Sequence, residues 1–190
     1  MTDWFTADCH FYHNNILKFC KDTRQFENVD DMNRTIINNW NSVVDHDDDI
    51  YVLGDFGFGT TTKMQNIFNQ LKGKKHLITG NHDKNTVEIN GWTSMTDYHG
   101  AKVIYTKYND KKIMLVLSHF AYAVWDKSHH GSINLYGHSH GAEPDTLRPN
   151  NQQLDVGVDA WNLYPCNVDM IMKKLNTLKQ FKNPEKYREN

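Results

Sequence analysis

The chain has 190 residues, of which 38% are hydrophobic, and its 21 basic and 23 acidic side chains give a formal net charge of -2. This length suits one domain with a sizeable core, spanning 1–190, and is short for two. The charge argues against a general polyanion-binding surface, so nucleic acid is not indicated as a bulk partner.

No apolar run approaches the length of a membrane span, and the polar N-terminal stretch does not resemble a signal peptide. The three cysteines are an odd number without Cys-x-x-Cys spacing, which favours neither a disulfide framework nor a thiolate zinc site. We therefore expect a cytoplasmic protein without a membrane partner.

The first half of the chain alternates strand-like and helical patterns. Residues 30–44 repeat apolar side chains at helical spacing after two acidic residues, which predicts a helix with one core-facing side. The other elements expected here are strands over 4–8, 50–53 and 76–79, and a helix over 63–71 that ends before Gly73.

The second half is richer in strands. Two strand-like runs within 102–119 flank Asn109-Asp110, which predicts a hairpin. Strands over 132–138 and 153–161 follow, then a helix over 169–181, and the polar tail 180–190 is expected to fray. Alternating strands and helices followed by a strand-rich half indicate the mixed α/β class.

Five apolar runs each end in side chains that can bind a metal or transfer a proton, and this recurrence is the strongest signal in the sequence. In α/β sheets, sites form where the loops at the carboxyl ends of strands converge. The side chains at the run ends are, in chain order, Asp8 and His10, Asp55, Asn81 and His82, His119, and His138 and His140.

The spacing and number of these side chains suit metal ions. Side chains alternate along an extended backbone, so Asp8 and His10 would emerge on one face and reach the same ion. The same spacing of two would put His138 and His140 on one face. Without His82, the set holds two carboxylates, one amide and four imidazoles, which suit two ions sharing a carboxylate. A mononuclear zinc hydrolase is the alternative. Taken alone, Gly-Asp and Gly-Asn-His-Asp are also typical of turns, whereas two histidines at a strand end have little structural reason to pair.

The ordered motifs resemble those of the calcineurin-like metallophosphoesterase superfamily: Asp-x-His, Gly-Asp, Gly-Asn-His-Asp, a later His after an apolar strand, and Gly-His-x-His. The segments "ADCHFYHNNI", "NWN" and "VGVDAW" look like those of small stand-alone bacterial and phage phosphoesterases. The resemblance implies a four-layer α-β-β-α sandwich with two mixed sheets. It also implies that one ion is held by Asp8, His10 and His140, the other by Asn81, His119 and His138, and that Asp55 bridges them.

The mechanism expected from this resemblance is in-line attack on phosphorus by a hydroxide held between two divalent cations. His82, next to the ligand Asn81, would serve as general acid. Asp83 would either orient the His82 imidazole or cap the turn, and we favour orientation. The resemblance points to Mn as the metal, while Fe, Zn, Ni, Co and Mg are alternatives.

The expected substrate is a small phosphodiester of the nucleotide or cyclic-nucleotide kind. The preference for a diester follows the resemblance, and the preference for a small molecule over DNA or RNA follows the charge. A nuclease, a phosphomonoesterase and a non-catalytic metal-binding adaptor domain are the alternatives. His13, Asn81 and His130 are candidate substrate contacts. Asp155 and Asp159 are candidate partners for the free N–H of ligand imidazoles, and a turn acid is the alternative role for Asp159. The natural substrate and the oligomeric state stay open.

Overall fold

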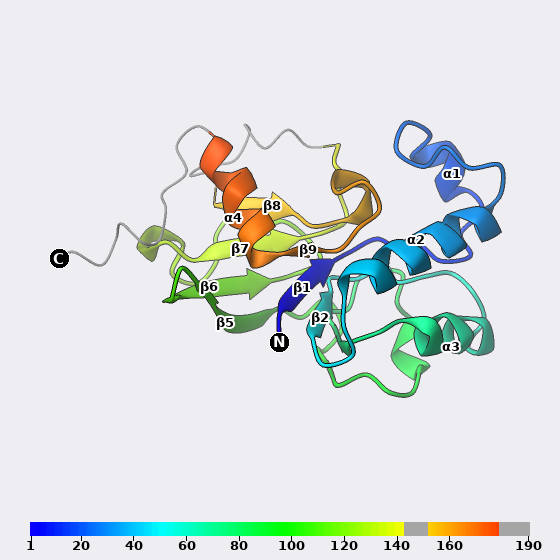
Figure 1. Cartoon of the computed structure of the whole chain (residues 1–190), viewed down its shortest axis with the longest axis horizontal. Helices are drawn as coiled ribbons and strands as arrows, with labels where there is room; N and C mark the ends of the chain where they lie inside the picture. Colours follow the sequence, from blue (N-terminus) through cyan, green and yellow to red (C-terminus); the bar gives the residue numbers. More distant parts are fainter. Residues whose placement is uncertain (143–151, 179–190) are drawn as a thin grey trace.

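Two mixed β-sheets and a small set of helices make up the part of the chain that the computed structural model describes, residues 1–142 and 152–178 (Figure 1). The chain is therefore α/β, as the sequence indicates. Helices α2 and α3 lie against the first sheet, on the side opposite the second sheet (Figure 1).

The first sheet has the strand order β4-β3-β2-β1-β9. Its first four strands in sequence run parallel, and β9 pairs antiparallel with β1. Because the parallel strands share one direction, their carboxyl ends lie at one edge of the sheet. The bounds are β1 Asp3–Thr6, β2 Asp49–Val52, β3 Lys74–Leu77, β4 Ser94–Met95 and β9 Cys166–Asn167.

The second sheet has the order β5-β6-β7-β8, with β5 antiparallel to β6 and the other pairs parallel. The predicted hairpin is confirmed: Asn109 and Asp110 have φ of 48° and 61°, the left-handed conformation that a two-residue turn needs. The bounds are β5 Lys102–Tyr108, β6 Lys111–Leu117, β7 Ile133–Tyr136 and β8 Gln153–Asp155.

The helices begin with side-chain caps where they are long. Asn28 accepts a hydrogen bond from the Asp31 amide at the start of α2, and Asn167 caps α4 in the same way. The described helices are α1 Ile16–Phe19, α2 Val29–Val43, α3 Thr61–Gln70 and α4 Val168–Thr177, with 3₁₀ turns η1 Thr86–Glu88, η2 Ser128–His130 and η4 Val158–Ala160. None of these helices has the length and apolarity to cross a bilayer.

Two apolar cores hold these layers together. The first lies under α2 and α3, where Met32, Ile36 and Trp40 are buried at the helical spacing seen in the sequence. The second lies between the sheets, and α4 packs on it through Ile171 and Leu175. The inter-sheet residues from the strands and their ends are Phe5, Ala7, Tyr51, Leu53, Ile78, Ile113, Leu115, Leu117, Ile133, Leu135, Leu154, Val156 and Cys166.

The predicted elements are present, with shifted ends. β3 begins at Lys74 rather than at residue 76, and the strand predicted over 153–161 stops at Asp155. It stops there because the Asp155 carboxylate accepts the Gly157 amide at 2.7 Å, which turns the chain. Sequence patterns missed the short elements α1, β4 and β9. The end predicted for the last helix and the tail 180–190 lie outside the described residues.

Candidate metal centre

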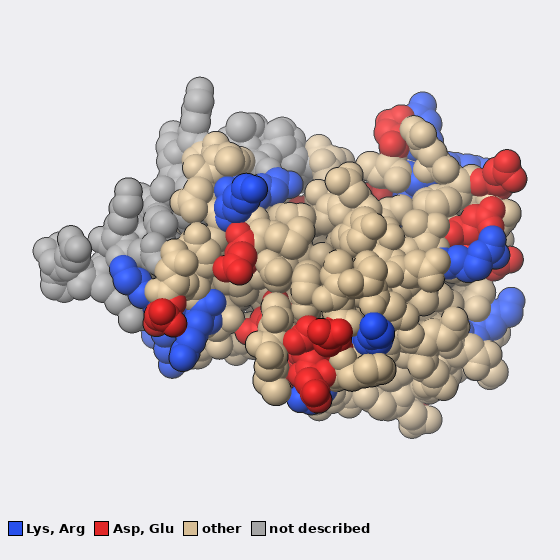
Figure 2. Space-filling model, viewed as in Figure 1, with Lys and Arg blue, Asp and Glu red and all other residues tan. Residues whose placement is uncertain are grey.

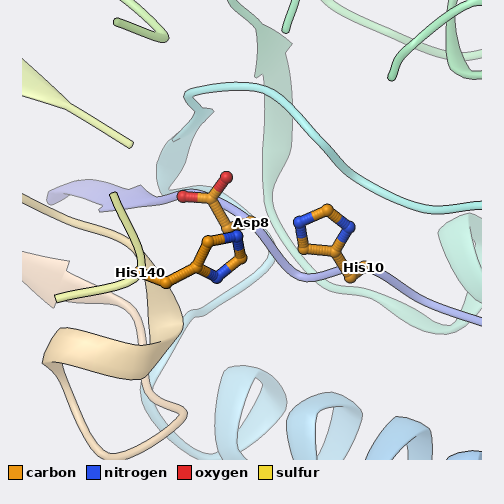
Figure 3. A group of neighbouring side chains, drawn as sticks. All are labelled: Asp8, His10 and His140. Atoms are coloured by element: carbon orange, nitrogen blue, oxygen red, sulfur yellow. The ribbon is translucent and has the colours of Figure 1, made fainter. Parts of the chain in front are cut away.

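The ends of β1, β2, β3, β6 and β7 bring the predicted side chains to one place. Asp8, His10 and His140 offer ligand atoms that all lie within 4.8 Å of one another. In Figure 3, Asp8 and His10 reach this group from the segment after β1, and His140 reaches it from the loop after β7. A second group of the same kind contains Asp55, His119 and His138.

Asp55 belongs to the second group and also faces the first. Its Oδ2 is 3.7 Å from His10 Nε2, and its Oδ1 is 3.6 Å from His119 Nε2. The carboxylate is buried and its Oδ1 also accepts the His82 amide at 2.9 Å, which fixes its direction. One oxygen of Asp55 therefore faces each group, which is the geometry of a bridging carboxylate.

The hydrogen bonds of His119 leave a lone pair facing oxygen atoms. Its Nδ1 lies 2.8 Å from the Leu53 carbonyl, which can only accept, so Nδ1 carries the proton. In the neutral ring, Nε2 then has no proton to give, yet it lies 2.9 Å from Asn81 Oδ1. These three acceptors, His119 Nε2, Asn81 Oδ1 and the Asp55 carboxylate, would all be satisfied if they held a divalent cation.

Several buried polar atoms in the first group have no hydrogen-bond partner. They are Asp8 Oδ1 and both ring nitrogens of His10. Burial raises the pKa of Asp8 well above its usual value, and burial together with nearby cationic side chains lowers the pKa of His10. Unpaired buried groups cost free energy, and metal coordination is one way to satisfy them. The residues present therefore fit a divalent cation.

Most of the predicted ligands have a strained backbone. Asp8, His10, Asp55, His138 and His140 have φ between 49° and 69°, a region that residues other than glycine adopt uncommonly. The expected reason for the pairing of Asp8 with His10 is therefore wrong, because β1 ends at Thr6 and neither residue is extended. Their side chains meet through two left-handed turns instead.

Glycines let the loops approach the ligands closely. A Cβ on Gly54, whose φ is 88°, would lie 2.3 Å from His119 Nδ1, and one on Gly80 would lie 2.5 Å from Asp55 Oδ1. A Cβ on Gly137 would lie 2.7 Å from Asp8 Oδ2. Each of these glycines precedes or follows a predicted ligand by one or two positions, as its place in the sequence indicates.

Asp159 is the partner of the imidazole of His140, a predicted ligand, which agrees with the first of its two predicted roles. Its Oδ2 lies 2.7 Å from His140 Nδ1, which leaves Nε2 directed at the first group. Burial alone would lower the pKa of His140, but the hydrogen bond with Asp159, the contact with Cys20 and the charge of Asp8 raise it to about 10. Surroundings that attract a second proton to the ring also attract a metal cation in its place.

Asp155 and Asp83 support loops rather than imidazoles. Asp155 accepts hydrogen bonds from Ser139 Oγ and the Gly141 amide, so it fixes the turn that carries His138 and His140. The preference for Asp83 as the orienter of His82 is wrong. Its carboxylate accepts the amides of Asp55, Phe56 and Gly80 at 2.9, 3.0 and 2.7 Å, so it ties the loops after β2 and β3 together.

The predicted substrate contacts separate into two places. His13 and His82 line a pocket of about 530 Å³ that Asp55, His10, His138 and His140 also line. His130 does not reach it: the residue is exposed in η2, before β7, whereas His138 follows β7. The length of β7 separates the two histidines, so the prediction for His130 is wrong.

No protein-family model matches the chain. The chain is 33% identical over 175 residues to the uncharacterized protein MJ1445 of Methanocaldococcus jannaschii, and the match covers 90% of this chain and 89% of that protein. The chain belongs to the MJ1445 family.

Other relatives of this MJ1445-family chain come from phages. The Gene 66 proteins of Mycobacterium phages L5 and D29 are 28% and 26% identical to it, over 83% and 93% of the chain and 86% and 97% of their own lengths. The crystal structure of AQ665 from Aquifex aeolicus, a protein of unknown function, is similar with a TM-score of 0.67 and 23% identity. That match covers 91% of this chain and 98% of AQ665, and shows a shared fold.

Arg24 is a site residue of this MJ1445-family chain that sequence patterns missed. Its guanidinium donates to both oxygens of Asp159, at 2.9 and 2.7 Å, and to the carbonyls of Asp8 and Cys9 at 2.6 and 3.0 Å. The arginine and aspartate side chains are fully buried. Arg24 lies in a polar stretch without motif or periodicity, so nothing in the sequence marks it.

Proposed function

We propose that this protein is a metallophosphoesterase of the calcineurin-like type that uses two divalent cations to hydrolyse a phosphodiester. The observation that carries the proposal is Asp55, which has one oxygen toward His10 and the other toward His119, 3.7 and 3.6 Å away. Two sheets with a common apolar core, and α2 and α3 outside the first, account for three layers of the proposed four-layer sandwich, while α4 packs on the core between the sheets.

The proposed ligand sets are those of the sequence resemblance. Asp8, His10 and His140 would hold one cation, and Asn81, His119 and His138 the other, with Asp55 between them. Bound there, two divalent cations would neutralise the phosphate and supply a hydroxide nucleophile near neutral pH. Mn is the metal we would try first, because the resemblance points to it.

His82 is the proposed proton donor to the leaving oxygen. Its side chain is exposed into the pocket, and its ring lies 6.2 Å from the ring of His10 and 4.7 Å from that of Phe58. Its backbone amide is held by Asp55, so the turn that supports the bridging carboxylate also carries this imidazole. Such a group contributes roughly 10²–10⁴-fold to the rate.

A small substrate is favoured over nucleic acid. On the face shown in Figure 2, basic side chains are interspersed with acidic ones and form no continuous field. This agrees with the net charge of -2 and contrasts with the basic patch of a typical nucleic-acid-binding surface.

The test is metal content together with hydrolysis of bis(p-nitrophenyl) phosphate by protein loaded with Mn²⁺. We expect two ions per chain and turnover. Asp55→Asn should lower both, whereas His82→Ala should keep two ions and lower kcat about 10²–10⁴-fold. His130→Ala, an exposed histidine away from the pocket, is the matched control.

Each alternative predicts a different result. A single ion per chain in the active protein would favour the mononuclear hydrolase. Faster cleavage of p-nitrophenyl phosphate than of the bis-ester would replace the diester assignment with a monoesterase, and cleavage of single-stranded DNA or RNA would favour a nuclease. Two bound ions without turnover of any ester, with each metal tried, would favour the adaptor domain.

A further inference from the structure

The pocket beside the candidate metal centre has two unlike sides. One side carries Asp55 with His10, His138 and His140. The other side is apolar and contains Ile16, Phe19 and Phe58. A phosphate ester whose phosphate lies at the Asp55 side can place its organic group against these apolar side chains.

Four rings form a continuous strip along this apolar side, and we call them the aromatic wall: Phe19, His13, Phe58 and His82. His13 stacks on Phe58 with a centroid distance of 3.9 Å and an interplanar angle of 18°. Phe19 meets His13 edge-on at 6.1 Å, and Phe58 meets His82 at 4.7 Å. The strip thus runs from α1 to the turn that holds the proposed acid.

The two phenylalanines of the aromatic wall are exposed. Phe58 keeps 40% of its surface accessible and Phe19 keeps 72%. Burial of apolar surface is favourable in proportion to the area removed from water, so a ligand that covers such a ring binds more tightly. Ile16 of α1 is buried beside them, which fixes the short helix that presents Phe19.

Phe58 also connects the wall to the centre itself. Its ring stacks on that of His10 at 5.4 Å, and His10 is one of the side chains proposed to hold a cation. A group that stacks on the free surface of Phe58 is thereby placed next to the phosphate position. Aromatic pairs in offset or edge-on geometry raise affinity by about two- to twelvefold beyond the effect of area burial.

We propose that the aromatic wall is a subsite for a planar aromatic group carried by the substrate. The substrate is then a phosphate ester with an aryl or nucleobase substituent rather than one with a small alkyl or sugar group alone. This inference rests on the proposed function, because the proposed cations would hold the phosphate. It adds Phe19 and Phe58 as specificity-determining residues.

The first test measures binding without turnover. Phenylphosphonate, cyclohexylphosphonate and methylphosphonate have a C–P bond that hydrolysis does not cleave, and they are titrated into Mn²⁺-loaded protein by calorimetry. We expect phenylphosphonate to bind about fivefold more tightly than cyclohexylphosphonate, which has similar size but no aromatic face. Affinities of the two within twofold of each other would overturn the inference.

The second test removes the wall. Phe19→Ala and Phe58→Leu should each weaken the binding of phenylphosphonate by about fivefold. The affinity for methylphosphonate should stay within twofold of the wild-type value. Tyr105→Ala, which removes an exposed ring on β5 away from the pocket, should change neither. If both wall variants keep the wild-type ratio of phenyl to methyl affinity, the wall is no subsite.

A competition arm separates the two sources of the ring. Adenosine 5′-monophosphate and ribose 5-phosphate are compared as competitors of bound phenylphosphonate. If the nucleotide displaces it and ribose 5-phosphate displaces little, the subsite is assigned to a nucleobase. If the two compounds displace it equally, the subsite is assigned to a smaller aryl group. The outcome is independent of catalysis. Ring-selective binding without diester turnover overturns the proposed function alone, and turnover without ring selectivity overturns this inference alone.

Discussion

Replacing Arg24 with methionine tests how the candidate metal centre is supported. Methionine keeps an unbranched apolar stem but removes a guanidinium that is fully buried. The change leaves the Asp159 carboxylate in the interior with only Thr23 and His140 as partners, and it leaves the carbonyls of Asp8 and Cys9 without their donor.

The expected cost follows from these contacts. Removing one partner of a buried ion pair costs about 3–5 kcal/mol, because the remaining charge is unpaired in a medium of low dielectric constant. The two orphaned carbonyls act in the same direction. A typical domain has about 5–15 kcal/mol of stability, so Arg24→Met should remove a large part of it.

Urea denaturation followed by circular dichroism, with EDTA present, measures this cost without a contribution from bound metal. Arg34→Met is the matched control, because Arg34 is exposed on α2 and pairs only with Asp31 at the surface. We expect the control to change stability by less than about 0.5 kcal/mol. A loss below about 1 kcal/mol for Arg24→Met would refute the reasoning.

Two further predictions concern a loop and the acid range. Gly54→Ala should displace His119, because Gly54 has a φ of 88° and the new Cβ would lie 2.3 Å from His119 Nδ1. Metal analysis should then find fewer than two ions per chain. Two ions per chain would contradict the close packing of Gly54 against His119. Burial raises the pKa of Asp48, but its carboxylate accepts hydrogen bonds from the amides of Thr2 and Asp45 and from the Trp4 indole. These hydrogen bonds outweigh burial and hold the pKa of Asp48 below the usual 3.8. A lowered folded-state pKa stabilises the protein above the unfolded pKa and loses that contribution as the pH falls, so Asp48→Asn should flatten the acid limb of the stability–pH curve. An unchanged slope would show that Asp48 titrates normally.

The sequence predicts the fold well where one physical signal dominates. Helix α2 follows from apolar spacing, and the hairpin follows from Asn109-Asp110, because these signals act within a few residues. The strand predicted over 153–161 is too long. The apolar alternation continues through Val158, but the hydrogen bond from the Gly157 amide to the Asp155 carboxylate turns the chain after Asp155. Apolar alternation reports burial, and Val156 and Val158 are buried without belonging to a strand.

The candidate site shows a similar division. The residues that gather at Asp55 could be named in advance, because each follows its own strand and the carboxyl ends of parallel strands meet. Arg24 and the true role of Asp83 could not, since both depend on contacts with distant backbone groups. His130 could not be excluded from the pocket in advance. It lies before β7 and the pocket lies after it, but the direction of β7 relative to the other strands is not given by the sequence alone.

The left-handed backbone of the candidate ligands limits how such a site can change over time. Asp, Asn and His tolerate this conformation better than most residues, and they are also metal-binding residues. A descendant that lost its ions would therefore still prefer these residue types at Asp8, Asp55 and His138, for reasons of backbone conformation alone. Asn81 and His119 have no positive φ, so natural substitutions at these two positions would give the clearest record of lost metal binding.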